Sequence, residues 1–360
     1  MGIFYCDDWE NCLFCAAMYL GFYNFYRSYN GNRMFTDPSS PIGDELGFPT
    51  FYLAQKLKEL GHRVATIDTD DLDKFDAVVF LDYPTKLNPH FQKLLRKKSP
   101  KIYLFLFESP AIRPDNWNKK NHGPFKKIFT WNPELVDNKK YFRSCLPNKL
   151  PELSTYTPST AQKFCCTIAS HKYGKHPNEI YTERVKAIRW FEQNHPEEFD
   201  LFGIGWDRFF LKQIPLANPV LSLLYKKVPQ LPRWKTFPSH RGPVKSKRAT
   251  LQQYKFSLCY ENSIFPGYLT EKIFDALFAG CVPVYLGDPE VEKSIPPDAF
   301  LNKKNFATYE KLYDFLKNMS PAEYENYRKA IHKFVFGPAI YPFSAQAFAD
   351  LVVKEIVNDR

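Results

Sequence analysis

Residues 254–287 constrain the fold of this chain more than any other segment, because they spell out a strand, a polar loop, a helix and a second strand. The mostly apolar run 254–260 predicts the first strand, and a turn containing proline and glycine follows it. An amphipathic helix then begins at residues 270–272, and the apolar run 282–286 predicts the second strand. A unit of this kind belongs to a parallel sheet whose faces are covered by helices.

The first turn of the predicted helix carries a carboxylate and an ammonium group, Glu271 and Lys272, just beyond the end of a strand. A helix N-terminus offers unpaired N–H groups and the positive end of the helix dipole, so it favours phosphate. Glu271 can accept hydrogen bonds from ribose hydroxyls, and Lys272 can neutralise a phosphate as a point charge. The segment predicts a site for a nucleoside diphosphate; the alternative is a buried unit in which both residues are solvated helix caps.

The composition indicates a globular protein with an anionic partner. The chain has 360 residues, enough for one large or two medium domains, and 44% of them are hydrophobic. The net charge of +10 fits nucleic acid, an anionic membrane surface or a phosphate-bearing small molecule. Because the lysines are scattered and no nucleic-acid motif is present, we expect no nucleic-acid partner and at most weak association with an anionic membrane.

Strands and helices alternate on both sides of segment 146–160, which is rich in Pro, Ser and Thr and predicts a linker. Before the linker we expect helices over 48–60 and 89–97 and strands over 64–67, 76–81, 101–107 and 128–131. After it we expect strands over 163–169 and 199–203, a helix over 178–194, a Pro-rich loop over about 207–243, and C-terminal helices from about 307.

This alternation predicts an α/β protein with two Rossmann-like, doubly wound domains that face a central cleft. We expect an N-terminal acceptor-binding domain over 1–150, a C-terminal nucleotide-binding domain over 151–340, and a C-terminal helix within 341–360 that returns to the first domain. Open sheets of this type bind ligands beyond the carboxyl ends of their strands, so the cleft is the expected site.

The 254–287 segment resembles the donor-site signature of the α-1,3/4-fucosyltransferase family, glycosyltransferase family 10. The shared elements are Tyr254-Lys255-Phe256, Glu261-Asn262, Tyr268-Leu269-Thr270-Glu271-Lys272 and Val282-Pro283-Val284. The resemblance covers roughly residues 60–345 and implies the GT-B architecture with GDP-fucose as the donor. It also implies a single inverting displacement onto the GlcNAc or glucose hydroxyl of a β-galactoside-containing glycan such as N-acetyllactosamine, in α-1,3 or α-1,4 linkage, giving Lewis-type products.

Glu108 is the candidate general base, because it follows the apolar run 101–107 directly and a carboxylate at that strand end faces the expected cleft. Burial beside aromatic residues would raise its pKa to a useful value. The family carries its proposed base in the matching segment, so the resemblance implies the same role. The alternative is that Glu108 caps the following turn.

Arg184, early in the predicted helix 178–194, can hold a diphosphate with its two-pronged guanidinium, and the resemblance implies that role. Asn262 and Glu271 are expected at the ribose, Tyr268 at the donor sugar or phosphate, and Lys272 at the diphosphate. The remaining candidates border the nucleotide or the sugar: Lys245, Lys247, Glu261 and Thr270. Gly203 and Gly205 would allow close approach of the backbone.

We expect no metal site and no required cofactor. Asp68-Thr69-Asp70 has the spelling of a metal-diphosphate motif but lies in the acceptor half, and we interpret it as a solvated loop. Cys6, Cys12 and Cys15 have no second Cys/His pair at zinc spacing. Four other cysteines fall in apolar runs and should be reduced core residues: Cys165, Cys166, Cys259 and Cys281.

Two alternatives stay open at this stage: a GT-B transferase that uses another nucleotide sugar, and a nucleotide- or glycan-binding protein without turnover. The charge-free stretch 11–26 is too short to span a bilayer and lacks a basic flank, so we expect no signal peptide or anchor and a cytoplasmic location. C-terminal heptad repeats, which support dimers in bacterial members of the family, are not seen, and we expect a monomer.

Overall fold

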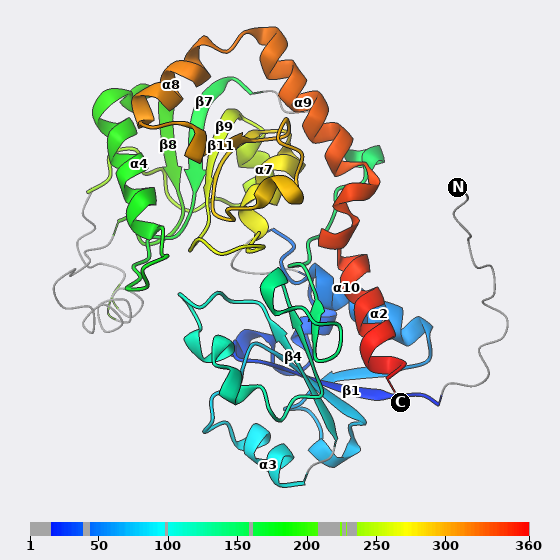
Figure 1. The fold of residues 1–360 in the computed structure, drawn as a ribbon. Coiled ribbons are helices and arrows are strands. Elements are labelled where there is room, and N and C mark those ends of the chain that lie inside the picture. Colours follow the sequence, from blue (N-terminus) through cyan, green and yellow to red (C-terminus); the bar gives the residue numbers. More distant parts are fainter. Residues whose placement is uncertain are drawn as a thin grey trace.

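The computed structural model describes residues 16–38, 44–97, 100–157, 161–207, 224, 228 and 236–359. These residues form two α/β halves, each built on a parallel sheet (Figure 1). The predicted pair of Rossmann-like domains is confirmed. Cys6, Cys12 and Cys15 lie outside the described residues, as does most of the predicted Pro-rich loop.

The first sheet has the order β2-β1-β3-β4-β5-β6, and all of its strand pairs are parallel. Its strands are β1 (Tyr19–Asn24), β2 (Arg63–Thr66), β3 (Ala77–Leu81), β4 (Lys101–Leu106), β5 (Lys127–Thr130) and β6 (Tyr141–Arg143). The helices of this half are α1 (Arg33–Thr36), α2 (Phe48–Glu59) and α3 (Pro89–Lys97). The strand order reverses between β1 and β3, which marks the point where such sheets bind ligands.

The second sheet has the order β11-β10-β9-β7-β8 and is also parallel, with its reversal between β7 and β9. Its strands are β7 (Lys163–Ile168), β8 (Phe199–Phe202), β9 (Tyr254–Tyr260), β10 (Val282–Leu286) and β11 (Leu301–Asn302). The helices after β6 are α4 (Tyr181–Asn194), α6 (Lys247–Leu251), α7 (Glu271–Ala279), α8 (Tyr309–Asn318), α9 (Pro321–Val335) and α10 (Ala345–Val352).

The unit predicted over 254–287 is β9-α7-β10, and it forms the centre of the second half. Every residue of β10 is buried, and α7 buries most of its residues against the sheet. The helix ends at Gly280, whose φ of 68° is the left-handed conformation that glycine adopts without steric cost. The four cysteines predicted for the core are buried and free, as expected.

Three strands were not predicted, and two of them, β6 and β11, have only three and two residues. The third is β1. β1 lies inside the charge-free stretch 11–26, where the sequence analysis weighed only a membrane segment, and it is a central strand of the first sheet with Leu20 and Phe22 fully buried. Only the middle of β1, residues 20–22, is buried. A short apolar run of this kind without alternation gives no strand-specific signal. Among the described residues, none of the helices is both long enough and apolar enough to cross a bilayer.

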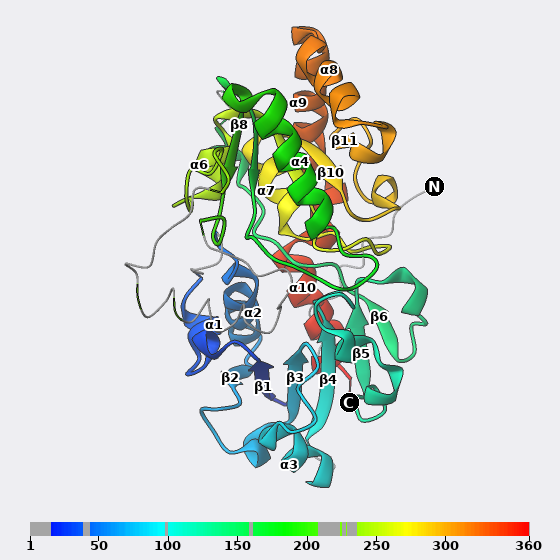
Figure 2. The ribbon, with the colours of Figure 1, turned by 90° about the vertical axis from the view of Figure 1, so that its left-hand side faces the viewer.

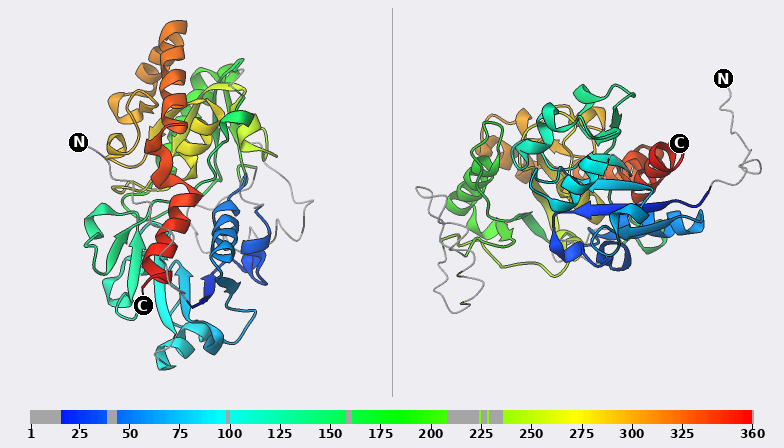
Figure 3. Two further views of the ribbon diagram at one scale, coloured as in Figure 1. Left: turned by 90° about the vertical axis from the view of Figure 1, so that its right-hand side faces the viewer. Right: turned by 90° about the horizontal axis from the view of Figure 1, so that it is seen from below.

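Two segments of the described chain cross between the halves. α9 and α10 run along one side of the molecule, from the second sheet to the first (Figure 3). The Phe348 ring of α10 packs edge-on to Phe105 of β4, with 5.2 Å between ring centroids. The second crossing segment, which follows β6, is tied to this one because Asn148 N–H donates to Phe343 C=O at 2.7 Å. The predicted linker is therefore hydrogen-bonded at Asn148 to the segment that precedes α10.

Candidate active-site cleft

The strands of the first sheet point their carboxyl ends toward the second half (Figure 2). Glu108 lies two residues beyond β4 at this edge. Next to it, Ser263 Oγ of the second half lies 2.7 Å from Ser109 Oγ, and both serines are fully buried. The two halves are therefore in contact directly beside Glu108, which places this carboxylate at the boundary between them.

The Glu108 carboxylate faces the signature loop of the second half. Tyr268 O–H donates to Glu108 Oε2 at 3.5 Å, although the two residues are 160 positions apart in the chain. Burial, reinforced by the negative charge of Asp82, raises the pKa of Glu108 to about 7, against the opposing effect of Lys172 and Lys272. A carboxylate with this pKa can accept a proton at neutral pH.

Asp82, which the sequence analysis missed, fixes the backbone that carries Glu108. Its Oδ1 accepts from Phe107 N–H at 2.8 Å, from Glu108 N–H at 3.0 Å and from Asn116 Nδ2 at 2.6 Å. Asp82 is buried and has a φ of 65°, a conformation that non-glycine residues adopt only where the surroundings enforce it. Its place immediately after an apolar strand was the available signal, the same one that identified Glu108.

Aromatic residues line the boundary around Glu108. Trp117 Nε1 donates to Glu108 C=O at 2.9 Å, and Trp131 Nε1 donates to Phe107 C=O at 3.0 Å. The Trp131 ring lies 4.8 Å from the Tyr268 ring, so it spans the two halves. These rings pack around the backbone that carries Glu108, and Trp131 holds the signature loop against the first half.

The N-terminus of α7 is organised by Glu261, whose side chain is fully buried. Its two oxygens accept from Thr270 N–H at 2.8 Å and from Thr270 Oγ1 at 2.6 Å. The Lys272 ammonium donates to Thr270 Oγ1 at 2.9 Å and to Glu271 Oε1 at 3.1 Å, and lies 3.4 Å from Glu261 Oε2. In this geometry Glu261 holds Thr270 and Lys272 in place rather than facing the cleft itself.

The charges at this helix end stabilise one another. Burial opposes ionisation of Glu271, but Lys272 and Lys247 outweigh it and hold the Glu271 pKa well below its usual range. Burial likewise opposes the Lys272 charge, yet Glu271 and Glu261 raise its pKa. Both groups are therefore charged at neutral pH, as a phosphate- and ribose-binding pair requires.

Lys247 begins α6 and pairs with Asp275 of α7, with 2.7 Å between Nζ and Oδ2. Burial raises the pKa of Asp275 to about 6, although Lys247 opposes this shift. Asp275 was not among the predicted site residues, since a lone acidic residue inside an apolar helix gives no motif.

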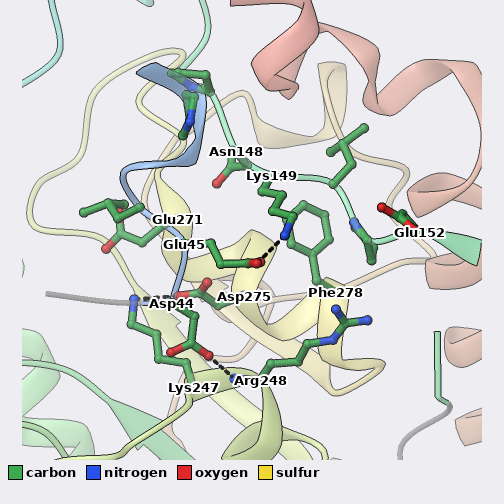
Figure 4. A pocket seen from close by; sticks show the side chains of 15 residues that line it. Asp44, Glu45, Asn148, Lys149, Glu152, Lys247, Arg248, Glu271, Asp275 and Phe278 are labelled. Atoms are coloured by element: carbon green, nitrogen blue, oxygen red, sulfur yellow. Dashed lines mark hydrogen bonds and ion pairs between the residues drawn. The ribbon is translucent and has the colours of Figure 1, made fainter. Parts of the chain in front are cut away.

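A cavity of about 370 Å³ lies beside this pair and is bounded by both halves (Figure 4). The second half contributes Lys247, Glu271 and Asp275 to its lining. From the first half, Asp44 Oδ2 accepts from Ser246 Oγ at 2.7 Å and from Arg248 N–H at 3.1 Å, so the first half contacts the segment that carries Lys247. This volume falls within the ~300–1,000 Å³ range of small-molecule sites.

The Arg184 guanidinium, which was expected to hold a diphosphate, is bonded to backbone carbonyls. It is buried, and its Nη2 donates to the backbone carbonyls of Tyr260 at 2.6 Å and Glu261 at 2.8 Å, at the end of β9. Its Nε is buried and has no hydrogen-bond partner among the described residues. The guanidinium thus supports the strand end that carries Glu261, and its contact with a phosphate stays a prediction.

The other expected residues are less closely connected. Asn262 is half-buried, and its backbone carbonyl accepts from Ile180 N–H at 3.2 Å. Lys245 is exposed and lies outside the cavity lining. Gly203 has a φ of 124°, and a Cβ there would lie 2.0 Å from Ala169 C=O, so this position needs glycine for backbone approach.

The loop Asp68-Thr69-Asp70 lies in the first half, where Asp68 Oδ2 accepts from Gly31 N–H and Asp70 pairs with Lys74. Across the described ranges, no three His, Cys, Asp or Glu side chains come close enough together to hold a metal ion. That transfer needs no metal stays a prediction.

Comparison with known proteins identifies the second half most clearly. Residues 229–335 match the family model described as glycosyltransferase family 10 (fucosyltransferase) C-term. The chain is 45% identical over 149 residues to the alpha-(1,3)-fucosyltransferase FucT of Helicobacter pylori, which covers 39% of this chain and 31% of that one. It is 41% identical over 81 residues to human alpha-(1,3)-fucosyltransferase 7, covering 22% of this chain and 24% of the relative.

These matched segments span less than a third of the length of the curated relatives. Solved structures extend the fold comparison to nearly the whole chain. A crystal structure of an alpha1,3-fucosyltransferase has a TM-score of 0.54 and 17% identity, covering 96% of this chain and 91% of that one. Anabaena Alr3699/HepE in complex with UDP-glucose has a TM-score of 0.55 and 10% identity, covering 94% and 98%. The GT-B fold and the resemblance to the fucosyltransferase family are both confirmed.

Proposed function

We propose that this chain, which carries the C-terminal domain of glycosyltransferase family 10, transfers fucose from GDP-fucose to a hydroxyl of an oligosaccharide. The acceptor we propose is the GlcNAc or glucose unit of a β-galactoside-containing glycan such as N-acetyllactosamine, in α-1,3 or α-1,4 linkage. The observation that carries the proposal is the juxtaposition of Glu108, with a pKa of about 7, and the Tyr268–Lys272 signature across the cleft.

Glu108 acts as the general base in a single inverting displacement. Its carboxylate takes the proton of the acceptor hydroxyl while the acceptor oxygen forms a bond to C1 of fucose. The bond from C1 to the β-phosphate oxygen breaks, and its electron pair leaves with GDP. Attack from the opposite face converts the β-linked donor into an α-linked product.

Lys272 stabilises the charge that develops on the leaving diphosphate. Its ammonium is held at the start of α7 by Thr270 and Glu271, so no reorganisation is needed as the charge grows. Glu271 accepts from the ribose hydroxyls, and we assign a phosphate oxygen at the end of β9 to the Arg184 guanidinium, whose Nε has no hydrogen-bond partner among the described residues. We propose that these cations replace a divalent metal, so that EDTA leaves the rate unchanged.

The test is release of GDP from GDP-fucose, with and without N-acetyllactosamine, in EDTA and against a panel of other nucleotide sugars. Acceptor-stimulated release from GDP-fucose alone supports the proposal. Release from another donor retains the fold and discards fucose. If the panel gives no release, binding of GDP by calorimetry separates a wrong acceptor from a protein that binds without turnover.

A further inference from the structure

The cavity between the halves is lined by one stripe of α7. Glu271, Asp275 and Phe278 stand at positions i, i+4 and i+7 of this helix, so they share one face (Figure 4). Four residues correspond to about 6 Å along a helix axis. The stripe therefore presents a carboxylate at the first turn, a second carboxylate about one turn later, and an aromatic ring beyond it.

Asp275 is an acidic residue in an otherwise mostly buried helix. The helix positions on both sides of it, Phe274 and Ala276, are fully buried, yet the Asp275 side chain is 23% exposed and lines the cavity. A largely buried Asp–Lys pair contributes little to stability, because the cost of desolvating both charges offsets their attraction. Apolar residues of similar size would suit the interior of this helix better. The pair therefore calls for a functional explanation.

The two groups match the hydrogen-bonding edge of guanine. This edge has an acceptor, O6, beside two donors, N1–H and N2–H, so it is recognised by an ammonium next to a carboxylate. Lys247 and Asp275 offer that pattern at 2.7 Å from each other, and the carboxylate has lone pairs on both oxygens. Adenine presents an amino donor in place of O6 and would face the ammonium unfavourably.

We infer that Lys247 and Asp275 recognise the guanine base of the nucleotide, with Asp275 as the residue that determines base specificity. Phe278 supplies an aromatic surface at the same face. This inference rests on the proposed function for the presence of a nucleoside diphosphate in the cleft. It goes further by giving the base a site of its own, one helix turn beyond the Glu271 carboxylate that we assign to the ribose.

The experiment compares the affinities of GDP, inosine diphosphate, xanthosine diphosphate and UDP for the wild-type chain and Asp275→Asn. Xanthine carries an oxygen where guanine carries the N2 amino group, so it requires a donor where guanine requires an acceptor. Wild type should bind GDP most tightly. Asp275→Asn should lose about 10- to 150-fold in GDP affinity, the range for hydrogen bonds to a charged group, and should bind xanthosine diphosphate more tightly than GDP.

Asp314→Asn, on the exposed face of α8, is the matched control and should bind all four nucleotides as wild type does. Equal losses for GDP, inosine diphosphate and xanthosine diphosphate in Asp275→Asn would overturn the inference, because they would place Asp275 at the ribose or in the packing. The wild-type series is decisive even if the variant does not fold: inosine diphosphate equal to GDP would also overturn it. Binding of UDP in preference to GDP would instead overturn the proposed donor.

Discussion

Tyr268 and Glu108 meet at 3.5 Å although they belong to different halves of the molecule, and this contact joins the signature loop to the candidate base. The Trp131 ring packs on Tyr268 beside it. The helix that carries Lys272 begins three residues beyond Tyr268, so the group assigned to the proton and the group assigned to the diphosphate are connected through one short loop. The relative placement of the two halves therefore sets the distance between these two assigned groups.

Replacing Glu108 tests the assignment of the base. Glu108→Gln keeps the shape of the side chain but cannot accept the proton, so the transfer rate should fall by about 10²- to 10⁴-fold while GDP affinity stays within about twofold. Single-turnover kinetics with GDP-fucose and calorimetry with GDP give the two quantities. Glu134→Gln, at an exposed position, is the control. A variant that retains turnover would remove Glu108 from the mechanism.

The dependence of kcat/KM on pH should reflect the ionisation of Glu108. Since the Glu108 pKa is raised to about 7 and the base acts when ionised, kcat/KM should rise as the pH increases through about 7 and then level off. Asp82→Asn removes a charge that raises this pKa, so the rising limb should move to lower pH. An unchanged limb in Asp82→Asn would show that Asp82 is neutral in the active protein.

As the pH rises, ionisation of Glu108 should lower the stability of the folded chain while it raises the activity. A carboxyl with a raised pKa binds its proton more tightly in the folded chain, so it lowers stability progressively as the pH rises from about 4.5 to about 7. Glu108→Gln removes this cost and should raise the free energy of unfolding at pH 8 by about 1–3 kcal/mol, with little change at pH 4. Denaturant unfolding at the two pH values measures it. An equal gain at both would point to packing rather than to the charge.

Part of the candidate site could be predicted from the sequence, and part of it could not. Glu108 and Lys272 were predictable because strand ends and helix starts are local features, and a parallel sheet brings such ends to one edge. Asp82 follows an apolar strand in the same way, so its place at the sheet edge was predictable, but nothing in its local sequence indicates a φ of 65° or three donors arriving from residues 107, 108 and 116. Arg184 was expected to contact a phosphate, but its backbone partners come from a strand 76 residues later, and such long-range packing has no local signature.

Lys272 should contribute to nucleotide binding. Lys272→Ala removes the cation at the start of α7 and should weaken GDP binding by about 1.5–3 kcal/mol, the range for hydrogen bonds to a charged group. Isothermal titration calorimetry measures the loss. Lys293→Ala, whose side chain is 72% exposed, should leave the affinity unchanged. If Lys272→Ala binds GDP as wild type does, the ammonium is not a phosphate ligand.

A side chain at Gly267 should disturb the contact between the signature loop and the first half. A Cβ there would lie 2.4 Å from the Trp131 carbonyl oxygen of the first half, and the residue has a φ of 80°. Gly242 has a similar φ of 94° but nothing within 4 Å of its Cβ, so Gly242→Ala is a matched control for backbone strain of about 1–2 kcal/mol. Gly267→Ala adds a steric clash with a carbonyl that cannot move without shifting the first sheet. We expect it to displace the signature loop from Glu108, so it should lower the transfer rate at least tenfold more than Gly242→Ala does.

GDP affinity should change equally in the Gly267→Ala and Gly242→Ala variants, since α7 retains Glu271 and Lys272. Equal transfer rates would mean that the signature loop works independently of its contact with Trp131.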